Sequence, residues 1–182
     1  MASVLVPLAQ GCEELEAVTV VGLLRRAGIG VVTAGLDDEP VRASRGTVLV
    51  PDTTLNEALK QQYDMVVLPG GLPGADHLDA DVRIHDLLKE MSETDRYTAA
   101  ICAAPKVLAG MGLLEGRQVT SFPGVLDGYH GFEYRTEAVV QDGKIITSRG
   151  PGTAMDFALT LIEQLVGKDK REEVEAGLQR SN

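Results

Sequence analysis

Short apolar runs alternate along the chain with longer segments in which apolar and polar positions follow a helical period. The short runs predict buried strands at residues 3–8, 29–34, 65–68 and 97–101. The longer segments predict helices at residues 14–27, 81–93, 105–110, 153–166 and 169–179. Because strands and helices alternate, we expect an α/β fold with an open, mostly parallel sheet and helices on both faces.

Several shorter patterns complete this prediction. Residues 41–50 predict one or two short strands interrupted at Arg45-Gly46, residues 54–57 have the capping-box spacing that opens a short helix, and residues 118–121 predict another strand. Residues 138–141 and 144–148 flank Asp142-Gly143, which is typical of a hairpin turn. The middle of the helix at residues 14–27 is apolar almost all round, which indicates a subunit interface.

Composition narrows the class of protein. The chain has 182 residues, of which 44% are hydrophobic, so we expect one domain over residues 1–182. A net charge of −10 and an aromatic content of 4% without Trp argue against nucleic-acid binding. The chain opens directly into a strand and contains no apolar run long enough to cross a bilayer, so we expect no targeting segment and no membrane partner.

Cysteine and histidine usage narrows the chemistry further. Cys12 and Cys102 do not make a disulfide scaffold, which predicts a reduced, cytoplasmic protein. The three histidines, His77, His85 and His130, are too few and too scattered to indicate a zinc site.

Cys102 stands at the corner where the strand at residues 97–101 runs into a helix that begins near Pro105. At such a corner a side chain projects from the tip of the sheet, and a helix N-terminus favours a thiolate over a thiol. The small neighbour Ala103 leaves a backbone N–H available for an oxyanion. The local stretch alone also fits a buried cysteine that acts as a small hydrophobe.

Two other loops are expected at the same edge of the sheet. Glu16 follows the first strand, and a carboxyl partly withdrawn from water has a raised pKa and can exchange a proton with a thiol or a carbonyl. Glu16 equally fits an acid that complements a helix N-terminus. Gly70 and Gly71 follow a buried strand and are candidates to supply an oxyanion N–H, although such a pair is also common in ordinary tight turns.

Five segments in register carry a resemblance over essentially the whole chain. They look like the DJ-one (Parkinsonism-associated deglycase) branch of the PfpI superfamily, with bacterial YajL-like members nearest. The segments are residues 12–17, 25–29, 68–71, 100–105 and 147–153. The resemblance implies a flavodoxin-like fold and a homodimer.

The resemblance also implies roles for individual residues. The family's reactive cysteine on a nucleophile elbow corresponds to Cys102, its protonated glutamate to Glu16, and its oxyanion-forming glycines to Gly70 and Gly71. Arg45 resembles a family arginine near the dimer interface and the pocket, and it is a candidate to bind an anion.

The sequence departs from the wider superfamily in ways that remove a histidine base. Ala103 stands where protease-like relatives carry a histidine, and Phe122-Pro123 stands where several members have a His-Pro pair. A protease or amidotransferase triad is therefore not expected. His130 reads as a surface histidine, and Cys12 as a bystander or else a resolving thiol for Cys102.

Arg149 and Pro151, in the turn after the hairpin, are further candidate pocket residues. Arg149 fits a structural ion pair or an anion-binding residue.

Two hypotheses for function follow. In the first, Cys102 and Glu16 convert a reactive carbonyl such as methylglyoxal into a 2-hydroxy acid, without glutathione, metal ion or organic cofactor. In the second, the same thiol is a sensor of oxidative stress or the switch of a redox-regulated chaperone. An isonitrile-hydrating or biosynthetic enzyme of the wider superfamily is a third reading, which Glu16 fits less well.

Overall fold

One seven-stranded sheet forms the centre of the protein in the computed structural model, which describes residues 1–180. Its strands are β1 (Ser3–Leu8), β2 (Gly30–Gly35), β5 (Thr53–Thr54), β6 (Met65–Leu68), β7 (Tyr97–Ile101), β10 (Val139–Asp142) and β11 (Ile145–Ser148). They lie in the order β10-β11-β7-β6-β1-β2-β5, and all neighbours are parallel except the β10–β11 hairpin. The expected open, mostly parallel sheet is confirmed.

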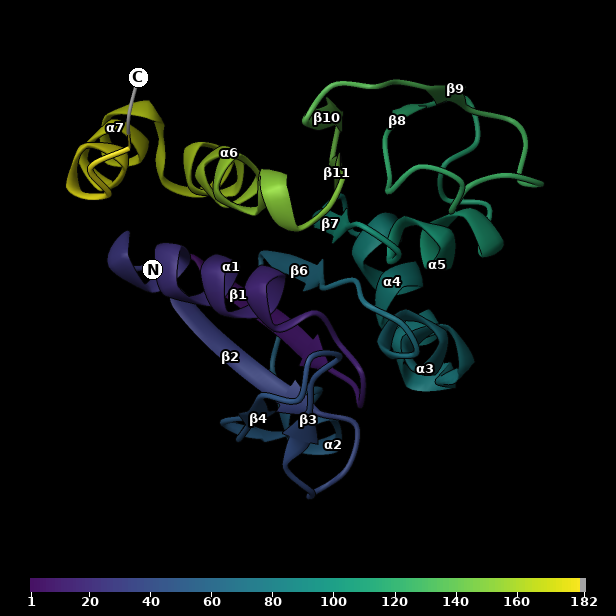
Figure 1. Ribbon diagram of the computed structural model, residues 1–182, viewed down its shortest axis with the longest axis horizontal. Helices are drawn as coiled ribbons and strands as arrows, with labels where there is room; N and C mark the ends of the chain where they lie inside the picture. Colours follow the sequence, from purple (N-terminus) through teal and green to yellow (C-terminus); the bar gives the residue numbers. More distant parts are fainter. Residues whose placement is uncertain (181–182) are drawn as a thin grey trace.

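Helices cover both faces of this sheet (Figure 1). On one face, α1 (Glu14–Arg26) and α6 (Ala154–Val166) pack side by side, and α7 (Lys168–Gly177) follows α6. The other face carries α2 (Leu55–Ala58), α3 (Gly74–Ala80), α4 (Val82–Glu93) and α5 (Pro105–Gly110). The result is a three-layer α/β/α arrangement.

The alternation of side chains along β1 shows why the sheet needs cover on both faces. Val4 and Val6 lie in the core beneath α1 and α6, whereas Leu5 between them lies in the opposite core. All three are fully buried, so an alternating polar pattern would not fit this strand.

Two small strand pairs lie outside the main sheet. β3 (Val41–Arg42) and β4 (Val48–Leu49) are the expected short strands on either side of Arg45-Gly46, and they pair antiparallel as a hairpin. β8 (Gln118–Val119) pairs parallel with β9 (Glu133–Tyr134). The strand predicted at residues 118–121 is therefore shorter than expected. Neither β9 nor α3 was predicted: both residues of β9 are exposed, and α3 buries only three residues, which leaves little apolar periodicity to read.

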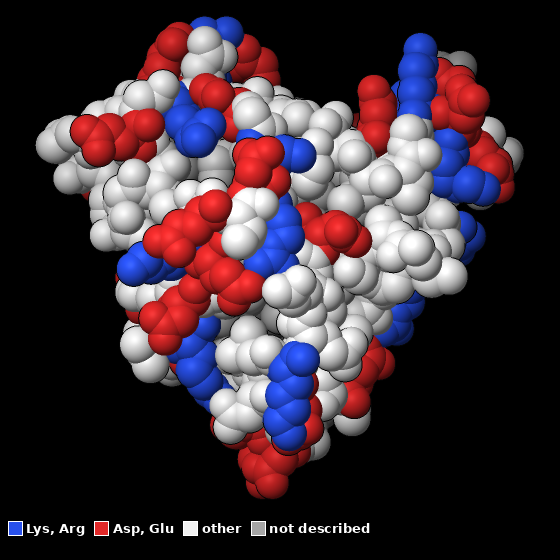
Figure 2. All heavy atoms as spheres, turned by 180° about the vertical axis from the view of Figure 1, so that it is seen from behind, with Lys and Arg blue, Asp and Glu red and all other residues white. Residues whose placement is uncertain are grey.

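The helices and the molecular surface bear on contact with membranes and nucleic acids. None of the described helices is long and apolar enough to cross a membrane. On the face seen in Figure 2, acidic and basic side chains are interspersed, and no broad basic patch is visible there. The predicted single domain extends to residues 181–182, which lie outside the described part.

Candidate active site

Cys102 occupies a strained elbow between β7 and α5. Its φ of 62° places a non-glycine residue in the left-handed region. Both of its backbone groups are tied down: its N–H donates to the Ser148 carbonyl at 3.0 Å, and its carbonyl accepts from the Phe122 N–H at 3.0 Å. These bonds hold the corner in place, with the side chain almost fully buried.

Glu16 in the first turn of α1 is a fully buried carboxyl. Its Oε2 accepts a hydrogen bond from the Gly70 N–H at 2.8 Å. Its Oε1 is buried and lacks a hydrogen-bond partner among the described residues. Burial raises the pKa of Glu16 to about 7, although the Gly70 N–H and the Cys102 thiol act in the opposite direction. The carboxyl is therefore divided between its acid and base forms near neutral pH.

Gly70 separates the carboxyl from the thiol, and nothing larger fits there. A Cβ at this position would lie 2.5 Å from the Cys102 Cβ and 2.8 Å from the Glu16 Oε2. Because the Gly70 N–H already donates to Glu16, it does not point at a substrate oxygen. The prediction that Gly70 supplies an oxyanion N–H is therefore wrong, and its role is to let Glu16 approach Cys102.

The N–H groups of Gly71 and Ala103 are the donors that reach the sulfur. Both form hydrogen bonds that lower the pKa of Cys102. Gly71 has a φ of 86°, and a Cβ there would lie 2.4 Å from the backbone nitrogen of Glu13. Two backbone N–H groups therefore converge on the sulfur and favour its thiolate form.

The thiol is nevertheless held in its protonated form while Glu16 is ionised. Burial, followed by repulsion from the Glu16 carboxylate and the hydrogen bond to it, raises the pKa of Cys102 to about 12. The backbone N–H groups favour the thiolate, but burial and the Glu16 carboxylate outweigh them in this state. Protonation of Glu16 removes the repulsion, so the two groups titrate as one coupled pair.

Gly150 and Phe122 close another side of the thiol. A Cβ on Gly150 would lie 3.9 Å from the Cys102 Sγ and 3.4 Å from the Phe122 Cδ2. Phe122 thus presents an apolar ring beside the site. Pro151 follows Gly150 directly and is partly buried.

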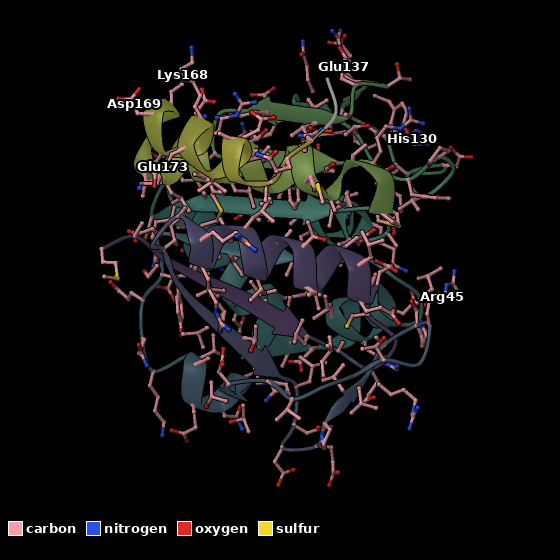
Figure 3. All side chains as sticks on the ribbon, turned by 60° about the vertical axis from the view of Figure 1, so that its left-hand side comes forward. Arg45, His130, Glu137, Lys168, Asp169 and Glu173 are labelled. Carbon is pink, nitrogen blue, oxygen red and sulfur yellow. The ribbon has the colours of Figure 1, made fainter. Side chains whose placement is uncertain are left out.

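The other candidate residues lie elsewhere. Arg45 is exposed on the β3–β4 turn and His130 is exposed on the loop before β9, both at the outer edge of the molecule in Figure 3. Arg149 donates to the Thr136 carbonyl at 3.0 Å. Cys12 is a free, buried thiol whose pKa burial raises to about 12, which fits a bystander better than a resolving thiol.

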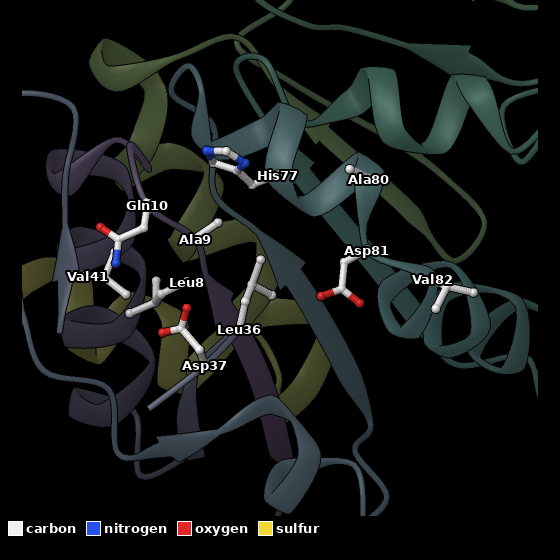
Figure 4. Close-up of a pocket in the computed structure, with 10 residues that line it drawn as sticks. All are labelled: Leu8, Ala9, Gln10, Leu36, Asp37, Val41, His77, Ala80, Asp81 and Val82. Atoms are coloured by element: carbon white, nitrogen blue, oxygen red, sulfur yellow. The ribbon is translucent and has the colours of Figure 1, made fainter. Parts of the chain in front are cut away.

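A separate pocket of about 490 Å³ lies at the carboxyl ends of β1 and β2 (Figure 4). Its walls include Gln10, Asp37 and His77, but none of the residues around Cys102.

Across residues 1–180, no cluster of three or more His, Cys, Asp or Glu side chains is arranged to hold a metal ion. The reactive groups of the site are therefore the thiol, the carboxyl and two backbone N–H groups.

Sequence reasoning missed the contributions of Gly150 and Phe122. The sequence showed them only as members of short motifs, with no contact to Cys102. Their approach to Cys102 depends on how the β10–β11 hairpin and the loop at residues 120–132 pack. The hydrogen bond between Phe122 and Cys102 could not be predicted from the sequence.

The fold and the site define an α/β protein with a cysteine elbow paired to a buried glutamate. Residues 2–164 match the DJ-1/PfpI family. The chain is 45% identical over 181 residues to protein dj-1beta of Drosophila melanogaster, which covers 97% of this chain and 96% of that one. It is 37% identical over 163 residues to the glutathione-independent glyoxalase DJR-1.2 of Caenorhabditis elegans, which covers 88% and 87% of the two chains.

Solved structures agree. The crystal structure of Drosophila melanogaster DJ-1beta superposes with a TM-score of 0.96 at 43% identity and covers 100% of this chain and 99% of that one. The structure of oxidized Toxoplasma gondii DJ-1 superposes with a TM-score of 0.95 at 37% identity and covers 100% of both chains. This chain belongs to the DJ-1/PfpI family. These relatives are eukaryotic, so the nearness to bacterial YajL-like members stays a prediction.

Proposed function

We propose that the protein converts 2-oxoaldehydes such as methylglyoxal into 2-hydroxy acids without glutathione, as a glyoxalase or deglycase-type enzyme. The observation that carries this proposal is the buried Glu16 carboxyl, which has one oxygen unpartnered and a pKa near neutral, beside the Cys102 thiol. A positioned acid–base group with such a pKa suits proton transfer at physiological pH.

The first step is addition of sulfur to the aldehyde. As the Cys102 Sγ forms a bond to the aldehyde carbon, the thiol proton passes to the Glu16 carboxylate. The aldehyde oxygen becomes an oxyanion held by the N–H groups of Gly71 and Ala103, and it then takes the proton from Glu16 to give a hemithioacetal.

The next steps move one proton and add one water. Glu16, again a carboxylate, removes the hydrogen of the former aldehyde carbon as a proton, and the electron pair shifts to the ketone oxygen to give an enediolate. Glu16 returns this proton to the neighbouring carbon, while the hydroxyl proton on the sulfur-bearing carbon passes to the other oxygen, which leaves a thioester on Cys102. Water then hydrolyses the thioester, releases the 2-hydroxy acid and restores the thiol, so the net reaction adds one water to the substrate.

Similarity supports this chemistry at the family level. The relative DJR-1.2, which is 37% identical over 88% of this chain, is named as a glutathione-independent glyoxalase. The Phe122 ring beside the thiol fits a small carbonyl compound with an apolar substituent.

The test is production of lactate from methylglyoxal by reduced protein without glutathione. We expect turnover by the wild type, its loss in Cys102→Ser, and near-wild-type turnover in Cys12→Ser. Cys12 is the matched control because it is also a free, buried thiol. Undiminished turnover in Cys102→Ser, or none in fully reduced wild type, would contradict the proposal.

A second candidate function is redox sensing through Cys102, which requires little or no turnover of a substrate. A relative of 37% identity, Toxoplasma gondii DJ-1, was solved in an oxidized form. One hydrogen peroxide would convert the thiol to a sulfenic acid with release of water, and a second would give a sulfinic acid, again with release of water, which ionises to a sulfinate. The Gly71 and Ala103 N–H groups and protonated Glu16 are placed to bind the sulfinate oxygens, either for sensing or for a redox-regulated chaperone.

Peroxide titration followed by intact-mass measurement separates the two candidates. A stable gain of two oxygen atoms that requires Cys102, without aldehyde turnover, favours the sensor. Rapid aldehyde turnover with slow oxidation favours the enzyme.

We propose further that the protein acts as a homodimer in the cytoplasm. A reduced Cys102 is required for the reaction, and a reducing compartment maintains it.

A further inference from the structure

A pocket of about 460 Å³ lies between the loop that leads to β9 and the segment after β11. Its walls include Leu126, Tyr129, Phe132 and Tyr134, so they are largely apolar or aromatic. Arg149 contributes the positive charge, and Asp127 contributes a carboxylate.

This pocket is distinct from the Cys102 site although the two share a segment of chain. Gly150 has an extended backbone, with φ of 164° and ψ of −164°. Neighbouring side chains in extended backbone point in opposite directions, so Arg149 faces away from the side on which Gly150 approaches Cys102. Neither Cys102 nor Glu16 lines the pocket.

Arg149 is unusual among the cationic side chains. Within residues 1–180, it has no carboxylate within 4.0 Å, although the chain carries a net charge of −10. Arg26, Arg42 and Arg45 also lack such a partner, but they are exposed to solvent. Lys144 also lacks a carboxylate partner, but its ammonium lies 4.0 Å from the centre of the Tyr97 ring. Arg149 is partly buried and has neither kind of partner in this part of the chain.

The hydrogen bonds of Arg149 leave most of its donors free. A guanidinium has five N–H donors. In the described residues, the Arg149 side chain donates one hydrogen bond, from Nη1 to the Thr136 carbonyl at 3.0 Å. A guanidinium anchored by one backbone oxygen and open to a cavity is well suited to a second, bidentate bond with a carboxylate.

We propose that this pocket binds a small aromatic carboxylate. The anion would pair with Arg149, and its ring would pack against Tyr129, Phe132 and Tyr134. Asp127 adds a negative charge to the same pocket and so disfavours a doubly charged anion such as phosphate. The proposal does not depend on the chemistry proposed for Cys102.

The experiment titrates full-length protein with benzoate by isothermal calorimetry and by protein NMR. We expect saturable binding with a dissociation constant on the order of millimolar. Arg149→Gln should weaken it by about tenfold or more, because a hydrogen-bonded charge pair is lost. Asp127→Asn should tighten it, and this gain separates loss of the anion partner from general damage to the loop.

Controls make the result specific. Arg135→Gln changes an arginine that already pairs with Glu133 and Glu137, so it should leave benzoate binding unchanged. Benzylamine, which has the same ring but a positive charge, should bind more weakly than benzoate, and so should inorganic phosphate. Absence of saturable benzoate binding, equal binding of benzylamine or phosphate, or an unchanged affinity in Arg149→Gln would overturn the proposal.

Discussion

At the scale of single residues, Glu16 is the side chain whose charged form is most unfavourable to bury at this site. It is fully buried, and burial raises its pKa to about 7 from an ordinary value of 4.5. The folded protein therefore binds a proton between these two pH values that the unfolded chain releases. It follows that Glu16 favours the folded state most below pH 4.5, and that this contribution is lost as the pH rises through 7.

Replacing Glu16 by Gln should remove this pH dependence. The free energy of unfolding of Glu16→Gln, relative to the wild type, should rise by about 3 kcal/mol between pH 4 and pH 8. Urea unfolding at several pH values measures this difference. Glu163→Gln is the control, because Glu163 is an exposed carboxylate on the neighbouring helix α6. A constant difference for Glu16→Gln across this range would show that the carboxyl does not titrate as described.

Single residues also show what the sequence alone can predict. Cys102 and Glu16 were predicted as site residues from a strand–helix corner, from the start of a helix and from the resemblance to a known family. The role of Gly70 was not predicted, because it depends on atoms of residues 16 and 102 that lie within 3 Å of where a Cβ on Gly70 would be. The balance of effects on the thiol was not predictable, because a helix N-terminus can be recognised in a sequence whereas burial beside a carboxylate cannot.

At the scale of elements, the loop between β1 and α1 interlocks with the loop between β6 and α3. A Cβ on Gly11 would lie 2.5 Å from the Pro73 ring, and one on Gly74 would lie 2.6 Å from the Cys12 nitrogen. The Glu13 N–H donates to the Gly70 carbonyl at 2.9 Å. These contacts fix the loop that carries the Gly71 N–H against the helix that carries Glu16.

Gly70→Ala tests this close approach. The added methyl group would clash with the backbone carbonyl of Ile101 as well as with the side chains of Glu16 and Cys102. Because a backbone atom is among these contacts, a rotamer change alone cannot relieve the clash. We expect a loss of roughly 1–3 kcal/mol in the free energy of unfolding and a large fall in aldehyde turnover. Gly177→Ala, in α7 with no atom within 4 Å of the new methyl, should be neutral or slightly stabilising. Equal effects of the two substitutions would contradict the close packing at Gly70.

The elements themselves were largely predictable, for a physical reason. The strands β1, β2, β6 and β7 are short, mainly apolar runs, and the bounds predicted for β1, β6 and β7 match the structure. The elements that were missed are α3, β5 and β9, which have little apolar periodicity of their own; β5 and β9 are two-residue strands that pair with β2 and β8.

At the scale of the whole molecule, one face remains apolar and exposed. Leu15 and Val18 on α1 are 51% and 54% exposed, and Val48 and Val50 near β4 are 50% and 80% exposed. A groove of about 260 Å³ lies between these two segments. The helix α1, drawn in purple at the front of Figure 3, was expected to lie at a subunit interface because its sequence is apolar almost all round. The exposed residues support a homodimer through this face.

Val18→Glu should therefore weaken self-association by at least about tenfold, because it places a charge in an apolar interface. Sedimentation velocity over a range of protein concentrations measures the change. Val82→Glu is the matched control, since Val82 is 68% exposed on α4, away from this face. A wild type that is monomeric at micromolar concentrations, or a dimer unaffected by Val18→Glu, would rule this interface out.

The most direct test of the account is the pH dependence of kcat/KM for methylglyoxal in wild type and Glu16→Gln, because the central claim is that Cys102 and Glu16 act as one unit. In the wild type, kcat/KM should rise with pH through about 7, as Glu16 becomes the base that accepts the thiol proton, and then level off. Glu16→Gln should fall at least about 100-fold and lose this transition. A wild-type profile that is flat across this range, or a Glu16→Gln variant with wild-type activity, would contradict the account.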